Sequence, residues 1–172
     1  MAGLSTPRSL FKRCLPQAVL LLASVFISVL SFASGGVPDD VAVIVNKENP
    51  VNGLTSKDLS GILRQDKQFW ENGRKIYLLM RESGATEKKV ILRKIYQMDD
   101  EELKRFWLSK MFTGDISSFP KTLHSTEAVK RFVAEDPDAV GFIDATYVDD
   151  SVKVLPIDGR LPQEKNYLLV ED

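Results

Sequence analysis

The chain has 172 residues, and its 23 Lys and Arg against 24 Asp and Glu give a formal charge of −1, which excludes the strongly basic surface of a nucleic-acid-binding protein. A single cysteine and a single histidine exclude a disulfide framework and metal sites built from cysteine or histidine clusters. The sequence also lacks a P-loop and a dinucleotide-binding fingerprint. We therefore expect no metal, no other cofactor and no nucleic-acid partner.

The first 33 residues have the pattern of a secretory signal peptide. Arg8, Lys12 and Arg13 form a basic leader, residues 18–33 are uncharged and largely apolar, and small residues stand at positions 31 and 33. An uncleaved membrane anchor is the alternative. As a helix, however, this apolar run would extend only about 24 Å, against a hydrocarbon core of about 30 Å. We expect cleavage and a periplasmic protein.

The rest of the chain is predicted to be a linker over residues 34–40 and one domain over residues 41–172. The leader holds three of the basic residues and no acidic one, which leaves a formal charge of −4 on residues 34–172. Cys14 precedes the apolar run, so it is not a lipoprotein attachment site and is removed with the leader. The predicted mature protein therefore has no thiol chemistry.

Strands and helices alternate in the first half of the predicted domain. Residues 41–45 are all apolar and mostly β-branched, which indicates a strand buried on both faces of a sheet. Thr55, with an acidic residue three positions on, is the expected N-cap of a helix. Residues 76–80 form a second apolar strand-like run, and a helix is expected to begin near Thr86.

The second half continues the alternation. Asp99 and Glu102 form the pattern of a capping box for a helix that Gly114 would end, and Ser125 or Thr126 is expected to cap another helix. Two further strands are predicted over residues 139–143 and 152–157. This order indicates an α/β domain whose mixed or mostly parallel sheet is flanked by helices.

The segment between the strand at residue 76 and the next helix is the candidate binding site. Arg81 stands at the strand's end, and Ser83, Gly84 and Thr86 follow at the helix start. Free backbone N–H groups and the positive end of the helix dipole favour an anion there, and an arginine adds a fork of donors. The alternative is purely structural: Ser83 or Thr86 caps the helix, and Arg81 lies in solvent or pairs with a surface carboxylate.

Catalytic machinery is not evident. A Ser/His/Asp triad would need His124, yet the sequence has no G-x-S-x-G turn. The structural interpretation of His124 is a loop histidine beside a helix cap. A hydrolase that uses His124 is kept as a minor hypothesis, and we expect a binding protein rather than an enzyme.

Several motifs in order resemble the phosphate-type substrate-binding proteins of ABC transporters. They are VAVIVNKENPV from Val41, WENG from Trp70, Arg81 with Ser83-Gly84 and Thr86, DAVGFI from Asp138, and VKVLPIDG from Val152. The similarity extends over residues 41–169. Two departures stand out: the segment from Arg81 is one residue shorter before the serine than in the family, and Ala85 separates the glycine from the threonine.

The resemblance implies the fold and the ligand. Complete members have two α/β lobes of the type 2 periplasmic-binding-protein architecture, with serine, threonine and helix-start amides on phosphate. The sequence before Val41 contains no second phosphate loop, so the chain looks like a short, single-lobe relative of this family. The expected ligand residues are Arg81, Ser83, Gly84 and Thr86, and Lys121 or a second copy of the chain is a candidate to complete the site.

Two functions follow as hypotheses. The first is an exported solute-binding domain that holds phosphate or another small oxyanion and is accessory to ABC-type phosphate uptake. The second is a ligand-free interaction or sensory module that docks on an envelope partner through the face left without a sister lobe. An ABC permease, a membrane sensor and a homodimer partner are the candidate protein partners.

Overall fold

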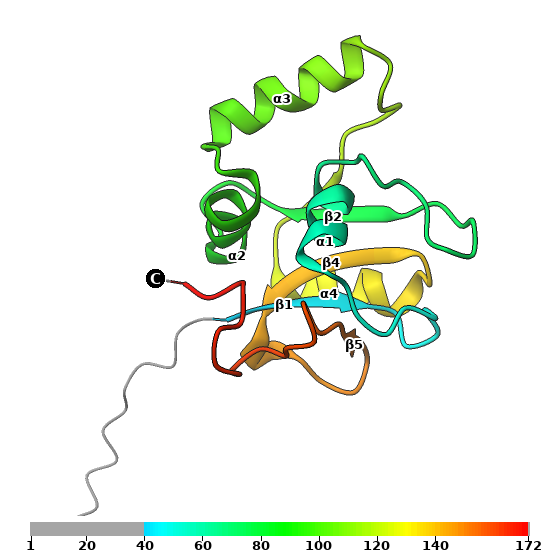
Figure 1. Ribbon diagram of the computed structural model, residues 1–172, viewed down its shortest axis with the longest axis vertical. Coiled ribbons are helices and arrows are strands. Elements are labelled where there is room, and N and C mark those ends of the chain that lie inside the picture. The colour runs from blue at the N-terminus through cyan, green and yellow to red at the C-terminus, as the bar shows by residue number, and fades with distance from the viewer. Residues whose placement is uncertain (1–39, 172) are drawn as a thin grey trace, which may run out of the picture. The chain divides into compact units, whose positions relative to one another are not determined.

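A mixed five-stranded sheet forms the centre of residues 40–171, the part of the chain that the computed structural model describes (Figure 1). The strand order is β3-β2-β4-β1-β5. Strand β2 is parallel to both β3 and β4, whereas β1 is antiparallel to β4 and β5. The strands are β1 (Val41–Val45), β2 (Tyr77–Arg81), β3 (Lys121–Leu123), β4 (Ala139–Asp144) and β5 (Lys153–Val154). The predicted α/β class with a mixed sheet flanked by helices is confirmed.

The helices begin where the capping residues predict. Thr55, Asp99 and Ser125 are the N-caps of three α-helices, and each side chain accepts a hydrogen bond from a backbone N–H of the first turn. Asp99 and Glu102 form the expected capping box. The helices are α1 (Ser56–Leu63), α2 (Thr86–Ile91), the π-helical η1 (Leu92–Tyr96), α3 (Asp100–Phe112), α4 (Thr126–Glu135) and the 3-10 helix η2 (Ala145–Tyr147).

Helices cover both faces of the sheet. In Figure 1, α1 lies in front of the sheet and α4 behind it. Two clusters of buried side chains match these two layers: Leu79 and Ile143 pack with Val129 of α4, whereas Val43 and Phe142 belong to the cluster that contains α1, α2 and η1. Every residue of β1 is buried, as expected for a strand covered on both faces.

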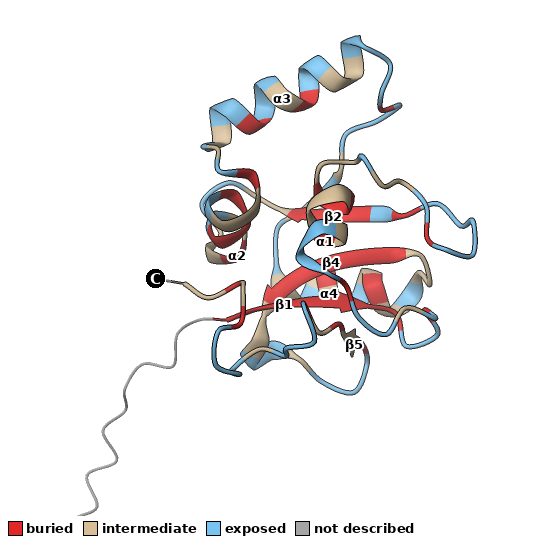
Figure 2. Cartoon of the chain, in the orientation of Figure 1, coloured by how far each residue is buried: buried red, intermediate tan, exposed pale blue. Residues whose placement is uncertain are grey.

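Helix α3 is exposed or only partly buried over most of its length (Figure 2). Leu103 and Trp107 are its only buried residues, and the Trp107 ring packs edge to face on Tyr96 and Phe106. These contacts place the aromatic residues near the middle of α3 in or against the core. At its end, in contrast, Phe112 is 88% exposed.

One strand was not predicted, one predicted strand is shorter in the structure, and two predicted segments lie outside the described residues. Strand β3 was not expected, and the predicted strand over residues 152–157 contains only the two residues of β5. The predicted signal peptide lies outside the described residues, and so does the predicted linker apart from Asp40. None of the helices between residues 40 and 171 has the length and apolar character needed to cross a membrane.

Candidate functional site

The candidate site lies where two parallel strands end. Strand β2 ends at Arg81 and is followed by α2, while β3 ends at Leu123 and is followed by α4. Ligands of α/β proteins commonly bind beyond the carboxyl ends of such strands, because the loops and helix starts meet there. The local sequence explains this placement, since polar residues follow each strand directly.

Arg81 joins the first turns of both helices. Its Nη1 donates hydrogen bonds to Glu87 Oε1 of α2 at 2.7 Å and to Thr126 Oγ1 of α4 at 2.8 Å. Thr126 Oγ1 in turn donates to Glu87 Oε1 at 3.0 Å, which closes a network of three side chains. The side chains of Arg81 and Glu87 are only 11% and 7% exposed, so this is a buried ion pair. Arg81 therefore does not lie in solvent: its nearest carboxylate is buried Glu87, and partly exposed Glu82 lies 3.7 Å from Nη2.

The guanidinium of Arg81 keeps donors that its neighbours do not use. Its Nε is buried and has no hydrogen-bond partner among the described residues. Its Nη2 lies 3.7 Å from Glu82 Oε1, too far for a hydrogen bond. Most buried polar atoms are hydrogen-bonded, so an unpaired buried N–H in a guanidinium invites a functional explanation.

Ser83 and Gly84 form the loop between Arg81 and α2. Ser83 Oγ accepts a hydrogen bond from Lys88 Nζ at 3.1 Å and donates one to Asp100 Oδ1 at 3.2 Å. Lys88 and Asp100 also form an ion pair, which ties the loop to the first residue of α3. Gly84 has a φ of +90° that favours glycine, and no heavy atom lies within 4 Å of the position where a Cβ would stand. The loop therefore turns in open space.

Thr86 is the first residue of α2, as predicted. The N-cap of this helix is Ala85, and it makes no side-chain capping bond. The structural alternative in which Ser83 or Thr86 caps the helix is therefore wrong. The acidic residue of the first turn is Glu87, which reaches Arg81 instead of solvent.

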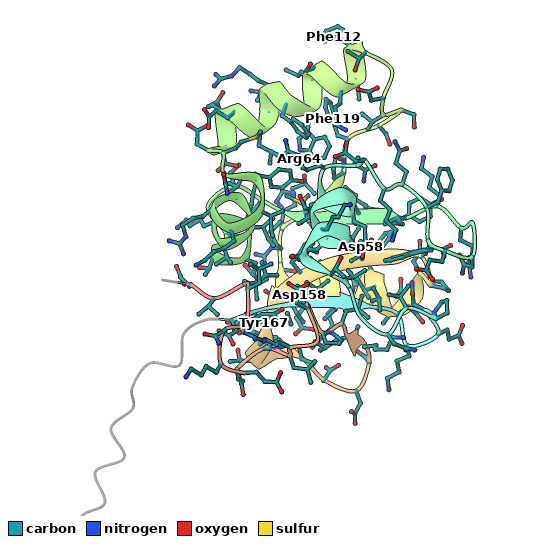
Figure 3. All side chains as sticks on the ribbon, in the orientation of Figure 1. Asp58, Arg64, Phe112, Phe119, Asp158 and Tyr167 are labelled. Atoms are coloured by element: carbon teal, nitrogen blue, oxygen red, sulfur yellow. The ribbon has the colours of Figure 1, made fainter. Side chains whose placement is uncertain are left out.

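A cleft of about 460 Å³ adjoins these residues. Arg81 and Ser83 belong to its lining, whereas Gly84 and Thr86 do not. Lys121, considered as a possible completion of the site, is also outside this lining: its Nζ lies 4.4 Å from the ring centroid of Phe132. Figure 3 shows Phe119, another lining residue, in the space below α3.

His124 lies beside this site but forms no triad. Its ring is 80% exposed, and Nδ1 lies 2.7 Å from Glu82 Oε2. This hydrogen bond lowers the pKa of the Glu82 carboxyl. The nearby charges of His124 and Arg81 lower the same pKa further. Within the described residues the histidine is bonded to a carboxylate and not to a serine, which agrees with the loop interpretation.

Glu87, Thr126, Lys88 and Asp100 belong to the site but were not predicted as site residues. The sequence pattern could have indicated Thr126 as a site residue, because Thr126 follows Ser125, the N-cap of a second helix that begins after a strand. Glu87 carried none, because a first-turn glutamate normally faces solvent and interacts with the helix dipole. Its burial depends on tertiary contacts with Arg81 of β2 and Thr126 of α4, which the local sequence does not specify.

Comparison with known proteins gives one curated relative. No protein-family model matches the chain. The phosphate-binding protein PstS of Bacillus subtilis (strain 168) is 25% identical over 127 residues, a match that covers 73% of this chain and 38% of that protein. The chain thus corresponds to well under half of this relative.

Three solved structures share the fold. An ABC-type phosphate transport receptor from Vibrio cholerae has a TM-score of 0.63 at 24% identity, covering 77% of this chain and 53% of that one. PstS from Borrelia burgdorferi has a TM-score of 0.63 at 17% identity, with 78% and 55% covered. A putative phosphate ABC transporter substrate-binding protein with bound phosphate from Clostridium perfringens has a TM-score of 0.58 at 23% identity, with 71% and 46% covered.

The chain therefore spans about half the length of the solved structures it matches, as expected for one lobe of a two-lobed architecture. The predicted single lobe of a type 2 periplasmic-binding-protein-like fold is confirmed. The resemblance indicated by the sequence motifs is confirmed too, since the chain is similar to a curated phosphate-binding protein and to a solved phosphate transport receptor.

Proposed function

We propose that the chain is an exported binding domain that holds phosphate or a similar oxyanion at Arg81, Ser83, Gly84 and Thr86, as an accessory to ABC-type phosphate uptake. The relatives are named as phosphate-binding or phosphate transport proteins, which supports a binding role rather than catalysis. Their place in transport also supports a periplasmic location and an ABC permease as partner. The predicted signal peptide of residues 1–33 would supply the export route.

One observation carries the proposal: the Arg81 guanidinium lies between two helix starts and retains unbonded donors. An oxyanion at Nη2 would receive a charge-assisted hydrogen bond, and a bidentate pair that includes buried Nε would require the surrounding side chains to move. The amide groups after Gly84 and the hydroxyl of Thr86 stand at the start of α2, where the helix dipole favours negative charge.

Neighbouring carboxylates limit the affinity. Glu87 already neutralises Arg81, and Asp100 pairs with Lys88 and accepts from Ser83. An incoming anion would compete with both, and with one lobe it would remain in contact with water, where ion pairs contribute only about 0–1 kcal/mol each. We therefore expect a Kd weaker than about 1 μM, that is, a binding free energy less favourable than about −8 kcal/mol.

Isothermal titration of the purified protein with phosphate tests the proposal. The informative variant is Arg81→Lys, which keeps a cation for buried Glu87 but removes the planar fork. We expect the affinity to fall by about tenfold or more, because a charge-assisted hydrogen bond contributes about 1.5–3 kcal/mol. Arg74→Lys is the matched control, since Arg74 pairs with Asp138 at 2.9 Å and is 53% exposed.

The absence of binding heat with phosphate at about 10 mM, well above a Kd of 1 mM, would reject phosphate as the ligand. Equal affinities of wild type and Arg81→Lys would reject the site instead.

Sedimentation of the same sample tests whether two copies of the chain pair. A homodimer remains an untested candidate.

A second candidate function is docking on an envelope partner without a ligand. It is favoured by the exposed apolar side chains Leu108 and Phe112 of α3 and by nearby Phe119. Contiguous exposed apolar groups often mark protein interaction sites. Binding of the domain to a purified permease that is lost in Phe112→Ser and unaffected by phosphate would favour this function over solute binding.

A further inference from the structure

The cleft beside Arg81 is larger than an inorganic oxyanion requires. Its volume of about 460 Å³ falls within the range of small-molecule pockets, about 300–1,000 Å³. A single phosphate ion would fill a small part of that space. One wall comes from α3, and the other comes from the ends of β2 and β3 with the loop that precedes β3.

The α3 wall changes from charged to apolar along its length. Asp100, Lys104 and Leu108 line the cleft at intervals of four residues, which places them on one face of the helix. Asp100 contacts the Arg81 loop through Ser83, so it marks the end of the cleft at the candidate oxyanion site. Leu108 lies two turns further along and is 39% exposed.

The facing wall changes in the same direction. Strand register pairs Met80 with Thr122, so Arg81 lies beyond this pair at the carboxyl end, while Phe119 and Pro120 lie before it. Phe119 is 47% exposed and lines the cleft. The two walls therefore share a polar end at Arg81 and an apolar end at Leu108 and Phe119.

The polar end contains a lysine that forms no ion pair among the described residues, and the carboxylate of Glu101 also lines the cleft. Arg81 is paired with Glu87, and Lys88 is paired with Asp100. Lys104 lines the cleft and forms no ion pair with any residue in the 40–171 range. A negative group at this end would thus meet Lys104 together with the Arg81 side chain, because both line the cleft.

We propose that the ligand of this cleft is an organic phosphate monoester, with its phosphate group between Arg81 and Lys104 and its apolar body against Leu108 and Phe119. This inference rests on the proposed function, because it assigns the class of ligand to the same oxyanion site. Burial of the two half-exposed apolar side chains would add a hydrophobic contribution that inorganic phosphate cannot provide.

Titration with matched ligands tests the inference. Inorganic phosphate, phenyl phosphate and phenol are titrated into the purified protein at about pH 8, where both phosphates carry close to two negative charges. We expect phenyl phosphate to bind at least about tenfold more tightly than inorganic phosphate, a difference of about 1.4 kcal/mol. Phenol should give no measurable binding.

Variants then place the two parts of the ligand. Leu108→Ser and Phe119→Ser should each reduce the preference for phenyl phosphate while the affinity for inorganic phosphate stays unchanged. Their controls are Leu161→Ser and Phe69→Ser, which change exposed apolar residues outside the cleft lining. Lys104→Gln should weaken both phosphates by about threefold or more, whereas Lys57→Gln should weaken neither.

Each outcome has a separate meaning. Equal affinities for the two phosphates would overturn the inference and leave the oxyanion function in place. A preference for phenyl phosphate that survives in Leu108→Ser and Phe119→Ser would also overturn it, because the apolar body would then lie elsewhere. Binding of phenyl phosphate alone would support the inference and exclude inorganic phosphate, and no binding of either would reject both proposals.

Discussion

Arg81 contributes to stability through the Nη1 edge of its guanidinium and, in our proposal, to ligand binding through the remaining N–H groups. Its ion pair with Glu87 is buried, so neither charge can be solvated if the other is removed. A buried charge without a partner is far more costly than the pair is stabilising. The stability contribution can therefore be measured separately from any ligand.

A double-mutant cycle measures the interaction free energy between Arg81 and Glu87. Arg81→Leu and Glu87→Leu should each lower the free energy of unfolding by about 3–5 kcal/mol, because each leaves one buried charge unpaired. The double variant should be clearly more stable than the sum of the two losses implies. Urea denaturation gives the three values, and strictly additive losses would show that the two side chains do not interact.

The contribution of Asp58 to the stability of the folded protein depends on pH. Its carboxylate accepts hydrogen bonds from the Thr55 hydroxyl at 2.6 Å and from Lys67 Nζ at 2.9 Å, and these bonds lower its pKa. A carboxyl whose pKa is lower in the folded state stabilises the protein above its unfolded pKa, and this stability is lost as the pH falls through the folded pKa.

Asp58→Asn should therefore lower the melting temperature at pH 7, and the difference from wild type should shrink as the pH falls below about 4. Thermal melts followed by circular dichroism at several pH values provide the comparison. Asp66→Asn is the control variant. Asp66 lies close to Asp58 in the chain, but its side chain is more exposed than that of Asp58 and pairs with Lys110 instead of Lys67. A difference that stays constant down to pH 2 would contradict the assignment.

Helices were easier to predict than strands at the scale of elements, and the reason is local chemistry. Thr55, Asp99 and Ser125 cap helices through bonds to residues three positions away, so the sequence pattern contains the whole interaction. Strand β3 has no such pattern: Lys121 and Thr122 are exposed at the edge of the sheet, and only pairing with β2 defines the strand. Likewise, the Arg81 site was predicted from its loop, but its partner Glu87 depends on tertiary packing.

The contact of α4 with β4 gives a test at this scale. A Cβ on Gly141 would lie 2.6 Å from Val129 Cγ1 of α4, so Gly141→Ala must push the helix from the sheet. We expect a loss of about 1–3 kcal/mol in the free energy of unfolding, typical of overpacking. Gly61→Ala is the control: its Cβ would meet Lys67 Cβ at 3.5 Å, an ordinary contact, and alanine in helix α1 should stabilise by about 0.5–1 kcal/mol.

Local stability should vary strongly across the molecule. Strands β1 and β4 are buried along almost their whole length, whereas α3 buries only Leu103 and Trp107. Regions with few buried apolar contacts open at low free energy. Hydrogen exchange should therefore be slow in β1 and β4 and much faster in α3, and equal protection of α3 and β1 would contradict this expectation.

Strand β1 joins residues that are distant in the sequence, and this placement affects how the protein can fold. Val41 is paired with Asp144, and its N–H donates to the carbonyl oxygen of Leu169. The middle of the sheet thus cannot assemble until most of the polypeptide is available. Contacts of such long range slow folding, because a large loop must close before any pairing is gained. A chain with this connectivity cannot complete its central sheet while only its first half has been synthesised, and the export that we propose would require such an unfolded state.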